Sequence, residues 1–184
     1  MDTRFKNIHQ KIIDRCREGD SKAQFQLYKL YYKAMYNVSL RIINDSMEAE
    51  DVMQEAFLSA FEKIETYKGE VSFGAWLKRI VINRSLDHLK KRKIQFEEVN
   101  EKTVQISDSG FETKEIDIQK IKKAIQDLPD GYRVVLSLFL IEGYDHEEIS
   151  SILGISNSSS RTQLLRAKNK LKILLTGKEL FSYN

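Results

Sequence analysis

The chain has 184 residues, of which 41% are hydrophobic and 31% are charged, with 8 glycines and 1 proline. This composition excludes a disordered chain and favours helices, because glycine and proline are the residues that interrupt them. The single cysteine, Cys16, excludes an internal disulfide and indicates a reducing compartment. No apolar run reaches the roughly 18 residues of a membrane span, and the first residues lack the apolar core of a signal peptide. We therefore expect a cytoplasmic protein of one ordinary or two small domains, without membrane insertion.

Basic and acidic residues are concentrated in separate segments, although the formal net charge is only +3. Residues 72–93 carry seven basic side chains against one acidic, and residues 157–172 carry five basic side chains and no acidic one. The segment at residues 94–119 is mainly acidic. Either basic run alone is as typical of a solvated helix face as of a surface that binds a polyanion. Two runs in different halves of the chain favour a polyanionic partner.

The first half of the chain shows three helical patterns. Residues 20–42 repeat apolar side chains at spacings of three and four. The face expected to point inward is Phe25, Tyr28, Tyr31, Tyr32, Met35 and Val38. Asp45 with Glu48 forms a capping pattern for a helix that runs to about residue 65. A third helix is expected over residues 72–92, and its inward residues are Phe73, Trp76, Leu77, Ile80, Val81 and Leu89.

The second half begins with a segment that has no sustained periodicity. Residues 94–113 are acidic and aperiodic, which predicts a linker between domains at residues 1–93 and 114–184. Pro129 suits the first turn of a helix running to about Ile141, because its missing N–H costs nothing there. No segment alternates convincingly at period two, so the fold class is predicted to be all-α, with two small helical domains.

A short helix, a tight turn and a longer basic helix follow. Asp145 and Glu148 form a capping pattern for a helix that ends at Gly154, a residue suited to the left-handed conformation. Ser156 can then cap a longer helix, and this order is typical of a helix-turn-helix, whose second helix enters the DNA major groove. The alternative is a helical hairpin in an unrelated bundle. It is less favoured because the outer face of the second helix carries side chains suited to bases and phosphates, namely Arg161, Thr162, Leu165 and Arg166.

Two stretches resemble regions of a known family. The stretch LPDGYRVVLSLFLIEGYDHEEISSILGISNSSSRTQLLRAKNKL resembles region 4 of the extracytoplasmic-function (ECF) sigma factors, small members of the sigma-70 family of bacterial RNA polymerase. The stretch AEDVMQEAFLSAFEKIETYKGEVSFGAWLKRIVINRSLDHLKKRK resembles their region 2. The resemblance covers about residues 19–175, and the order and separation of the two regions also match. It implies a factor that binds core RNA polymerase, recognises the −35 and −10 promoter elements, and promotes DNA melting.

The resemblance implies three groups of contact residues. Those matching the positions that grip the coiled coil of the polymerase β′ subunit are Asp51, Gln54 and Glu55. Those matching the −10 element contacts are Tyr67, Lys68, Phe73, Arg79, Asn83 and Arg84. Those matching the −35 element contacts are Ser159, Arg161, Thr162, Leu165 and Arg166. For the first group the alternative is a plain solvated helix face, although spacings of three and four do place its members on one side of a helix.

The residue types of region 2 suit single-stranded DNA. Residues 67–73 match the family loop that captures a flipped base of the −10 element. Aromatic side chains can stack bases, basic ones can hold phosphates, and the Asn83 amide can read a base edge. Trp76 is expected in the core rather than as a stacking platform.

Two positions depart from the family pattern. Ser160 stands where a β-branched apolar residue is common, so we expect one looser core contact. Gln163 stands where arginine is common, so we expect a lost phosphate contact and an amide that could still read adenine. These departures leave the fold prediction intact and the −35 sequence open.

The implied partners are core RNA polymerase, through its β′ coiled coil and β flap, and promoter DNA; an anti-sigma factor is a further partner that the residues do not identify. The three histidines are scattered, and no phosphate loop or nucleophile–base pair is visible, so we predict no metal, cofactor or enzymatic activity. A stand-alone helix-turn-helix regulator would leave the Asp51–Glu55 face and the segment 67–92 without a role. A recombinase would need a catalytic domain, usually with strands, and none is predicted.

Overall fold

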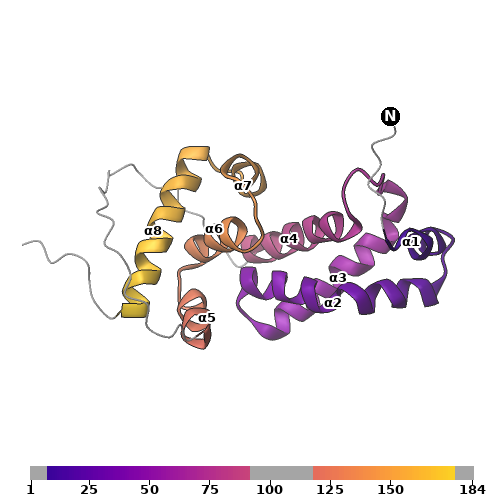
Figure 1. The fold of residues 1–184 in the computed structure, drawn as a ribbon, viewed down its shortest axis with the longest axis horizontal. Helices are drawn as coiled ribbons and strands as arrows, with labels where there is room; N and C mark the ends of the chain where they lie inside the picture. The colour runs from indigo at the N-terminus through magenta and orange to yellow at the C-terminus, as the bar shows by residue number, and fades with distance from the viewer. Residues whose placement is uncertain (1–7, 92–117, 177–184) are drawn as a thin grey trace, which may run out of the picture. The chain divides into compact units, whose positions relative to one another are not determined.

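The structure is a computed structural model that describes residues 8–91 and 118–176. Within these two ranges the chain forms eight α-helices and one 3₁₀ helix and no strand, so the predicted all-α fold is confirmed there. The elements in chain order are α1 (Gln10–Arg17), α2 (Ser21–Ile43), α3 (Ser46–Glu62), η1 (Ile64–Thr66), α4 (Phe73–Lys91), α5 (Ile118–Gln126), α6 (Asp130–Leu140), α7 (His146–Leu153) and α8 (Asn157–Thr176) (Figure 1).

The chain divides into two compact units, Met1–Ile94 and Gln95–Asn184. Helices α1 to α4 and η1 belong to the first unit, and α5 to α8 belong to the second. The acidic linker predicted at residues 94–113 lies outside the described residues. None of the described helices combines the length and apolar character that crossing a bilayer requires.

The first unit is a bundle in which α2, α3 and α4 pack against one another (Figure 1). Helix α2 begins where the Asp20 carboxylate accepts hydrogen bonds from the backbone N–H groups of Lys22 and Ala23. It ends at Asn44, which has the left-handed φ of 61°. The Asp45 carboxylate caps α3 in the same way as Asp20 caps α2. The bundle core includes Leu27, Met35, Val38, Ile42, Val52, Met53, Phe57, Leu77, Val81, Ile82, Leu86 and Leu89.

The inward face of α2 differs from the predicted one. Phe25 is 59% exposed and Tyr32 is 44% exposed, whereas Ala23 and Leu27 are fully buried. Apolar and aromatic side chains surround most of this helix, so their spacing alone could not distinguish the packed side. The exposed Tyr32 ring instead stacks on Tyr28 of the same helix, with 5.6 Å between ring centroids.

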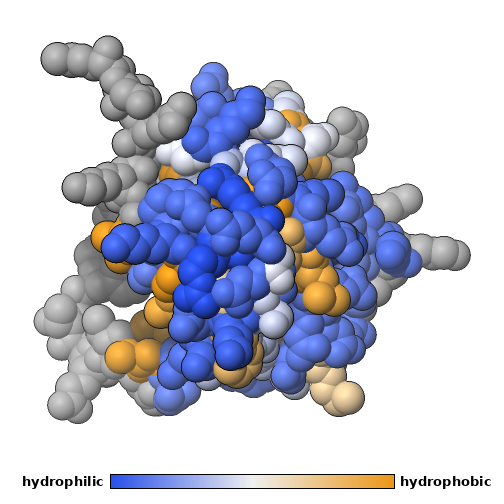
Figure 2. All heavy atoms as spheres, turned by 90° about the vertical axis from the view of Figure 1, so that its right-hand side faces the viewer, coloured by the Kyte–Doolittle hydropathy of each residue, from blue (hydrophilic) through white to orange (hydrophobic). Residues whose placement is uncertain are grey.

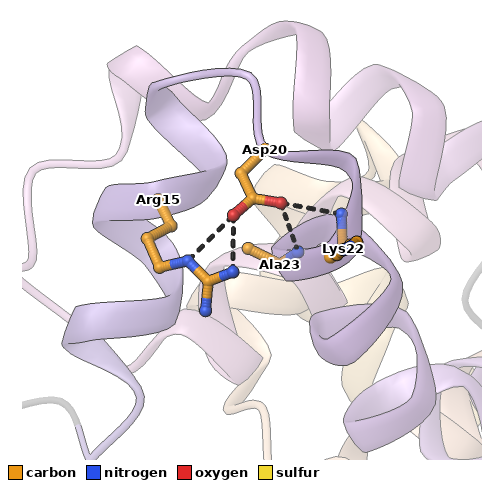
Figure 3. Close-up of polar contacts among 4 residues, drawn as sticks. All are labelled: Arg15, Asp20, Lys22 and Ala23. Carbon is orange, nitrogen blue, oxygen red and sulfur yellow. Dashed lines mark hydrogen bonds and ion pairs between the residues drawn. The ribbon is translucent and has the colours of Figure 1, made fainter.

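Helix α1 was not predicted, and it packs against α2 and η1. The corner between α1 and α2 is held by Arg15, whose Nε and Nη2 atoms donate to Asp20 Oδ2 at 2.9 and 2.5 Å (Figure 3). Because the same carboxylate caps α2, one side chain joins the two helices. The hydrogen bond from Arg15 lowers the pKa of Asp20, and the capping N–H of Ala23 adds to this effect.

In the second unit α8 packs against α5, α6 and α7. Both hydrogen bonds of the predicted capping box are present, since the Asp145 and Glu148 carboxylates each accept from the backbone N–H of the other residue. Gly154 ends α7 with the left-handed φ of 69°, as predicted. Ser156 Oγ accepts from the Ser159 N–H at 3.0 Å and so caps α8. These local bonds fix the turn between α7 and α8.

The start of α6 is also built from local contacts. Pro129 is the residue before the first turn rather than within it, one position earlier than predicted. Arg133 is buried, and its Nη1 atom donates to the Leu128 carbonyl at 3.0 Å while its Nη2 atom pairs with Asp130. The buried charge is therefore compensated within a few residues of its own position.

Candidate nucleic-acid and protein interfaces

The exposed side of α3 carries the three residues predicted to contact polymerase. Asp51, Gln54 and Glu55 are all exposed, and helical spacing places them in one row. Leu58 continues this row one turn later and is 64% exposed. Leu58 was not predicted as a contact residue, although its spacing of three from Glu55 was a usable signal. We call these four residues the α3 row; its mixture of acidic, amide and apolar side chains suits a protein partner.

Within the described parts of the chain, the polar contacts of the α3 row are weak, so they would oppose the binding of a partner very little. Gln54 Nε2 donates to Glu50 Oε1 at the long distance of 3.5 Å. Glu55 Oε2 lies 3.8 Å from Arg84 Nη1 of α4, and both side chains are well exposed. Exposed ion pairs of this kind contribute at most about 1 kcal/mol. Glu55 and Arg84 can therefore exchange this contact for other partners at small cost.

Three of the predicted −10 contact residues lie on the outer side of α4. Asn83 and Arg84 are exposed, and Arg79 is half-buried. Arg79 and Asn83 are four residues apart and share a side of the helix, whereas Arg84 is turned from Asn83 by about 100°. An amide between two guanidinium groups can meet a base edge and the neighbouring phosphates of one strand.

Tyr67 and Phe73, two of the predicted −10 contact residues, have their side chains in the core of the first unit. Tyr67 is 2% exposed and Phe73 is 1% exposed. Their rings meet edge to face with centroids 5.5 Å apart, and each also packs against Trp76 at 5.4 and 5.5 Å. Rings covered by other rings have no open face on which a base could stack. The two side chains instead hold the ends of the loop between η1 and α4, and Trp76 packs with them as expected.

The loop at residues 67–72 presents its middle to solvent. Lys68 and Val71 are exposed, and Gly69 between them has the left-handed φ of 77°. The Tyr67 hydroxyl donates to the Val71 carbonyl at 2.7 Å, which closes the loop on itself. We call this segment the tip loop. Lys68, another predicted contact, thus projects from a short loop whose two ends are tied together.

On α8 the predicted −35 contact residues lie opposite the buried side of the helix. The buried residues are Ser160, Gln163, Leu164 and Ala167. The predicted contact residues are Ser159, Arg161, Thr162, Leu165 and Arg166. Arg161 is exposed, and the other four are half-buried. At 100° per residue the two sets are centred on different arcs of the helix. Arg161 Nε also donates to Asn157 Oδ1 at 2.8 Å, which orients the guanidinium along the first turn.

Gln163 and Ser160 behave differently from their predictions. Gln163 is buried, so the expectation that its amide reads adenine is wrong in this structure. Its Oε1 atom accepts no hydrogen bond from any of the described residues. Ser160 does not simply loosen the core, because its Oγ atom lies 2.9 Å from His146 Nδ1 and forms a hydrogen bond there. Burial of both residues depends on how α7 and α6 cover α8, which spacing along α8 does not reveal.

His146 connects the two helices of the helix-turn-helix. Its ring stacks on Phe139 of α6, with 4.7 Å between ring centroids. Burial lowers the pKa of His146 below its ordinary value of 6.5, the positive charge of Arg161 lowers it further, and the negative charge of Asp145 acts in the opposite direction. The junction of α7 and α8 therefore favours the neutral imidazole.

Cys16 is a buried thiol in α1. Burial raises its pKa to about 11, with a further contribution from the nearby Asp20 charge. The thiol is therefore protonated near neutral pH, which makes it a poor nucleophile. Among the described residues, no three His, Cys, Asp or Glu side chains gather closely enough to hold a metal ion.

Comparison with protein families matches both units of the chain. Residues 27–94 match the model of sigma-70 region 2, and residues 118–171 match that of sigma-70 region 4. The first match contains the α3 row, the tip loop and the outer side of α4. The second contains α5, α6, α7 and most of α8. The two regions occur in the order predicted from the sequence.

Curated relatives match over nearly their whole length. The chain is 26% identical to the RNA polymerase sigma-H factor of Pseudomonas aeruginosa, covering 88% of this chain and 91% of the relative. It is 27% identical to the ECF RNA polymerase sigma factor SigW of Bacillus subtilis, covering 89% and 94%. It is also 26% identical to the ECF RNA polymerase sigma-E factor of Escherichia coli, covering 88% and 91%.

Two solved structures share the fold. One is the sigma factor RpoE in complex with the anti-sigma factor NepR from Bartonella quintana, with 24% identity, a TM-score of 0.57, and coverage of 84% of this chain and 97% of that chain. The other is CnrH in complex with the cytosolic domain of CnrY, with 20% identity, a TM-score of 0.54, and coverage of 91% and 97%. At 20% and 24% identity, these two structures show that the chain shares their fold and nothing more.

Proposed function

This chain belongs to the extracytoplasmic-function group of the sigma-70 family, and from that premise we propose how its residues direct bacterial core RNA polymerase to promoters. The factor binds core polymerase and promoter DNA and starts transcription through its region 2 and region 4 units. The observation that carries the assignment is the presence of both regions, in family order, on one chain. Each region then presents its own exposed residues to a partner.

The α3 row is proposed to bind the coiled coil of the polymerase β′ subunit. Support comes from the exposure of Asp51, Gln54 and Glu55 on one side of α3 and from the weakness of their contacts within the chain. Charged groups that a partner desolvates and pairs set the orientation of docking, and truncating or reversing them raises the dissociation rate. The β flap is proposed as a second polymerase contact, made by the region 4 unit.

The outer side of α4 and the tip loop are proposed to bind the −10 element as a single strand. Lys68 and Arg84 have exposed charges suited to phosphates, and Asn83 has an exposed amide suited to a base edge. Because Tyr67 and Phe73 are buried, a flipped base would be received by the backbone and exposed side chains of the tip loop rather than by these rings.

The outer arc of α8 is proposed to bind the −35 element in the major groove. Arg161 and Arg166 are five residues apart and point in different directions around the helix, so one can face bases while the other faces a phosphate. Thr162 and Leu165 belong to the same set of predicted contact residues and suit a base edge and a thymine methyl group.

An anti-sigma factor is a further proposed partner. The relative from Bartonella quintana was solved with one, and the chain shares its fold. We assign no catalytic step to this chain, because the polymerase carries the nucleotidyl-transfer chemistry. Since core polymerase and promoter DNA meet in the bacterial cytoplasm, we propose that the chain acts there. A stand-alone regulator is not favoured, because it would not need a region 2 unit.

Run-off transcription with purified core polymerase and a library of promoter fragments tests the proposal. Core polymerase with this chain should transcribe a subset of fragments that share two elements, and core polymerase alone should not. Binding of the chain to duplex DNA without polymerase, together with no transcription in its presence, would support the stand-alone regulator instead.

A further inference from the structure

We infer that Arg17, the last residue of α1, positions the tip loop for base recognition at the −10 element. This inference rests on the proposed function of region 2, and it adds a residue from outside the segments that resemble the family's contact motifs. Neither Arg17 nor α1 was assigned a role from the sequence or from the family resemblance.

Arg17 reaches across from α1 to the backbone at the start of the tip loop. Its Nη2 atom donates to the Tyr67 carbonyl at 2.6 Å. Its Nη1 atom donates to Asp14 Oδ1 at 3.0 Å, and the same oxygen accepts from Gln10 Nε2 at 2.8 Å. The Arg17 side chain is 28% exposed. A charged donor held from behind by a carboxylate, and partly shielded from water, makes a stronger hydrogen bond than a neutral exposed one.

Tyr67 is consequently fixed from two sides. Arg17 holds its carbonyl, and the core holds its ring against Phe73 and Trp76. The Tyr67 hydroxyl in turn holds the Val71 carbonyl at the other end of the loop. Tyr67 therefore contacts both ends of the tip loop, and Arg17 of α1 hydrogen-bonds to the Tyr67 backbone.

A loop that receives a flipped base discriminates between bases only if its backbone is held close to the productive geometry. The tip of this loop, around Lys68 and Gly69, lies beyond the tied ends, and Lys68 is exposed. The face of the first unit seen in Figure 2 is covered mainly by hydrophilic side chains, with scattered apolar patches. Such a surface suits a polar strand passing over it. Loss of the hydrogen bond from Arg17 to the Tyr67 carbonyl should therefore widen the range of loop conformations and reduce the preference for one base at the −10 element.

The chain offers a matched control in Arg15, two residues earlier in the same helix. Arg15 also makes an ion pair through its guanidinium, but with Asp20 at the corner between α1 and α2 rather than with the tip loop (Figure 3). Arg15→Met removes the same kind of group from the same helix and leaves Tyr67 untouched. Loss of helix stability alone would affect both variants, whereas loss of loop positioning would affect only Arg17→Met.

The test uses holoenzyme assembled from core polymerase and the full chain, on a promoter that the wild-type factor opens. A template series changes the −10 element one base at a time, and permanganate reactivity of unpaired thymines measures opening. Arg17→Met should reduce the wild-type base preference at one −10 position by about tenfold, the effect of losing a charge-assisted hydrogen bond. Arg17→Lys, which keeps a charged donor, should recover part of that preference. Arg15→Met should reproduce the wild-type profile.

Tyr67→Phe provides a second route to the same loop, because it removes the hydroxyl that donates to the Val71 carbonyl and keeps the ring in the core. It should weaken the preference at the same −10 position as Arg17→Met. The inference is overturned if Arg17→Met lowers opening equally on every template, if it matches Arg15→Met, or if its profile equals that of the wild type. Failure of the wild-type holoenzyme to open any promoter would instead refute the proposed function, so the two failures are distinguishable.

Discussion

Gln163 and Ser160 are buried polar residues one turn apart on α8, and they differ in whether their polar atoms are paired. Ser160 Oγ bonds to His146 at 2.9 Å. Gln163 Oε1 has no hydrogen-bond partner among the described residues. A buried acceptor that loses water and gains no donor costs about 1–3 kcal/mol. The helix-turn-helix thus contains one polar contact that stabilises it and one polar atom that does not.

Replacing Gln163 with an apolar residue of similar size should stabilise the second unit. Gln163→Leu removes the unpaired oxygen and keeps most of the buried volume, so we expect the free energy of unfolding to rise by about 1 kcal/mol. Chemical denaturation followed by circular dichroism measures the change. Ser160→Ala is the control, because losing a paired hydroxyl should lower stability. Destabilisation by Gln163→Leu would mean that the amide oxygen is satisfied, for instance by a bound water.

Residues whose role is local were predictable, and residues whose role depends on distant packing were not. Asp45, Asp145 and Gly154 act within four residues of their own position, so their capping roles followed from sequence. The family resemblance implied a DNA contact for Tyr67, and the Gln163 amide was expected to be able to read adenine. The Tyr67 ring is buried against Phe73 and Trp76 of the next helix, and Gln163 lies on the buried side of α8, so packing between elements decides both cases and residue type alone does not.

At the scale of elements, the junction of α7 and α8 should respond to pH through His146. The folded chain holds the pKa of this imidazole below 6.5, mainly through burial and the neighbouring Arg161 charge, with Lys168 also lowering it and Asp145 opposing. Below pH 6.5 the unfolded chain therefore takes up a proton that the folded chain resists. Folding stability from this group is present above pH 6.5 and is lost as the pH falls below it.

Urea denaturation of the full chain at pH 7.5 and pH 5.5 tests this expectation. The wild-type second unit should be less stable at pH 5.5, and His146→Gln should show a smaller difference between the two pH values. The Asp20 carboxyl does not confuse the comparison, because its pKa lies below 3.8 and its effect belongs to more acidic conditions. An unchanged pH difference in His146→Gln would show that other groups control it.

The α3 row carries the proposed polymerase contact, and charge reversal within it should weaken binding. Asp51→Lys would place an unpaired charge at a desolvated contact and should cost about 2–5 kcal/mol of association free energy with core polymerase. Glu18→Lys is the matched control, since it reverses an exposed acidic residue elsewhere in the same unit. Co-purification with core polymerase and helicity by circular dichroism provide the measurements. Wild-type co-purification of Asp51→Lys would remove the α3 row from the docking surface.

Helix bounds were predicted within a few residues for the patterns that were recognised, because caps and periodicity are encoded locally. The side of α2 that faces the core was predicted less well, since Phe25 and Tyr32 are exposed. The short helices α1 and α5 went unpredicted altogether. Each is under ten residues and depends on packing against a longer helix, so its sequence pattern is too brief to distinguish it from a loop.

At the scale of the whole molecule, two separately folded units present two different binding chemistries. The region 4 unit offers a recognition helix with arginines on its outer arc, which suits the major groove of duplex DNA. The region 2 unit offers an amide, guanidinium groups and an exposed loop, which suit a single strand. The charge runs in the sequence indicated a polyanion at both places, but only the arrangement of side chains on α4 and α8 separates one kind of DNA from the other.

Substitutions in the two units should therefore damage different steps of initiation. Arg161→Ala should weaken duplex binding at the −35 element. If Arg161 faces a base, the loss is about 1–3 kcal/mol and confined to one position of the element. If it faces a phosphate, binding weakens for all sequences and the salt dependence becomes shallower.

Asn83→Ala should leave −35 binding intact and reduce permanganate reactivity of the −10 thymines. Because Asn83 and Arg161 lie in different units, the double variant should show the sum of the two free-energy losses. Normal promoter opening by both Asn83→Ala and Arg84→Ala would mean that region 2 does not hold the open strand through α4, and a duplex-only regulator would then explain the chain better.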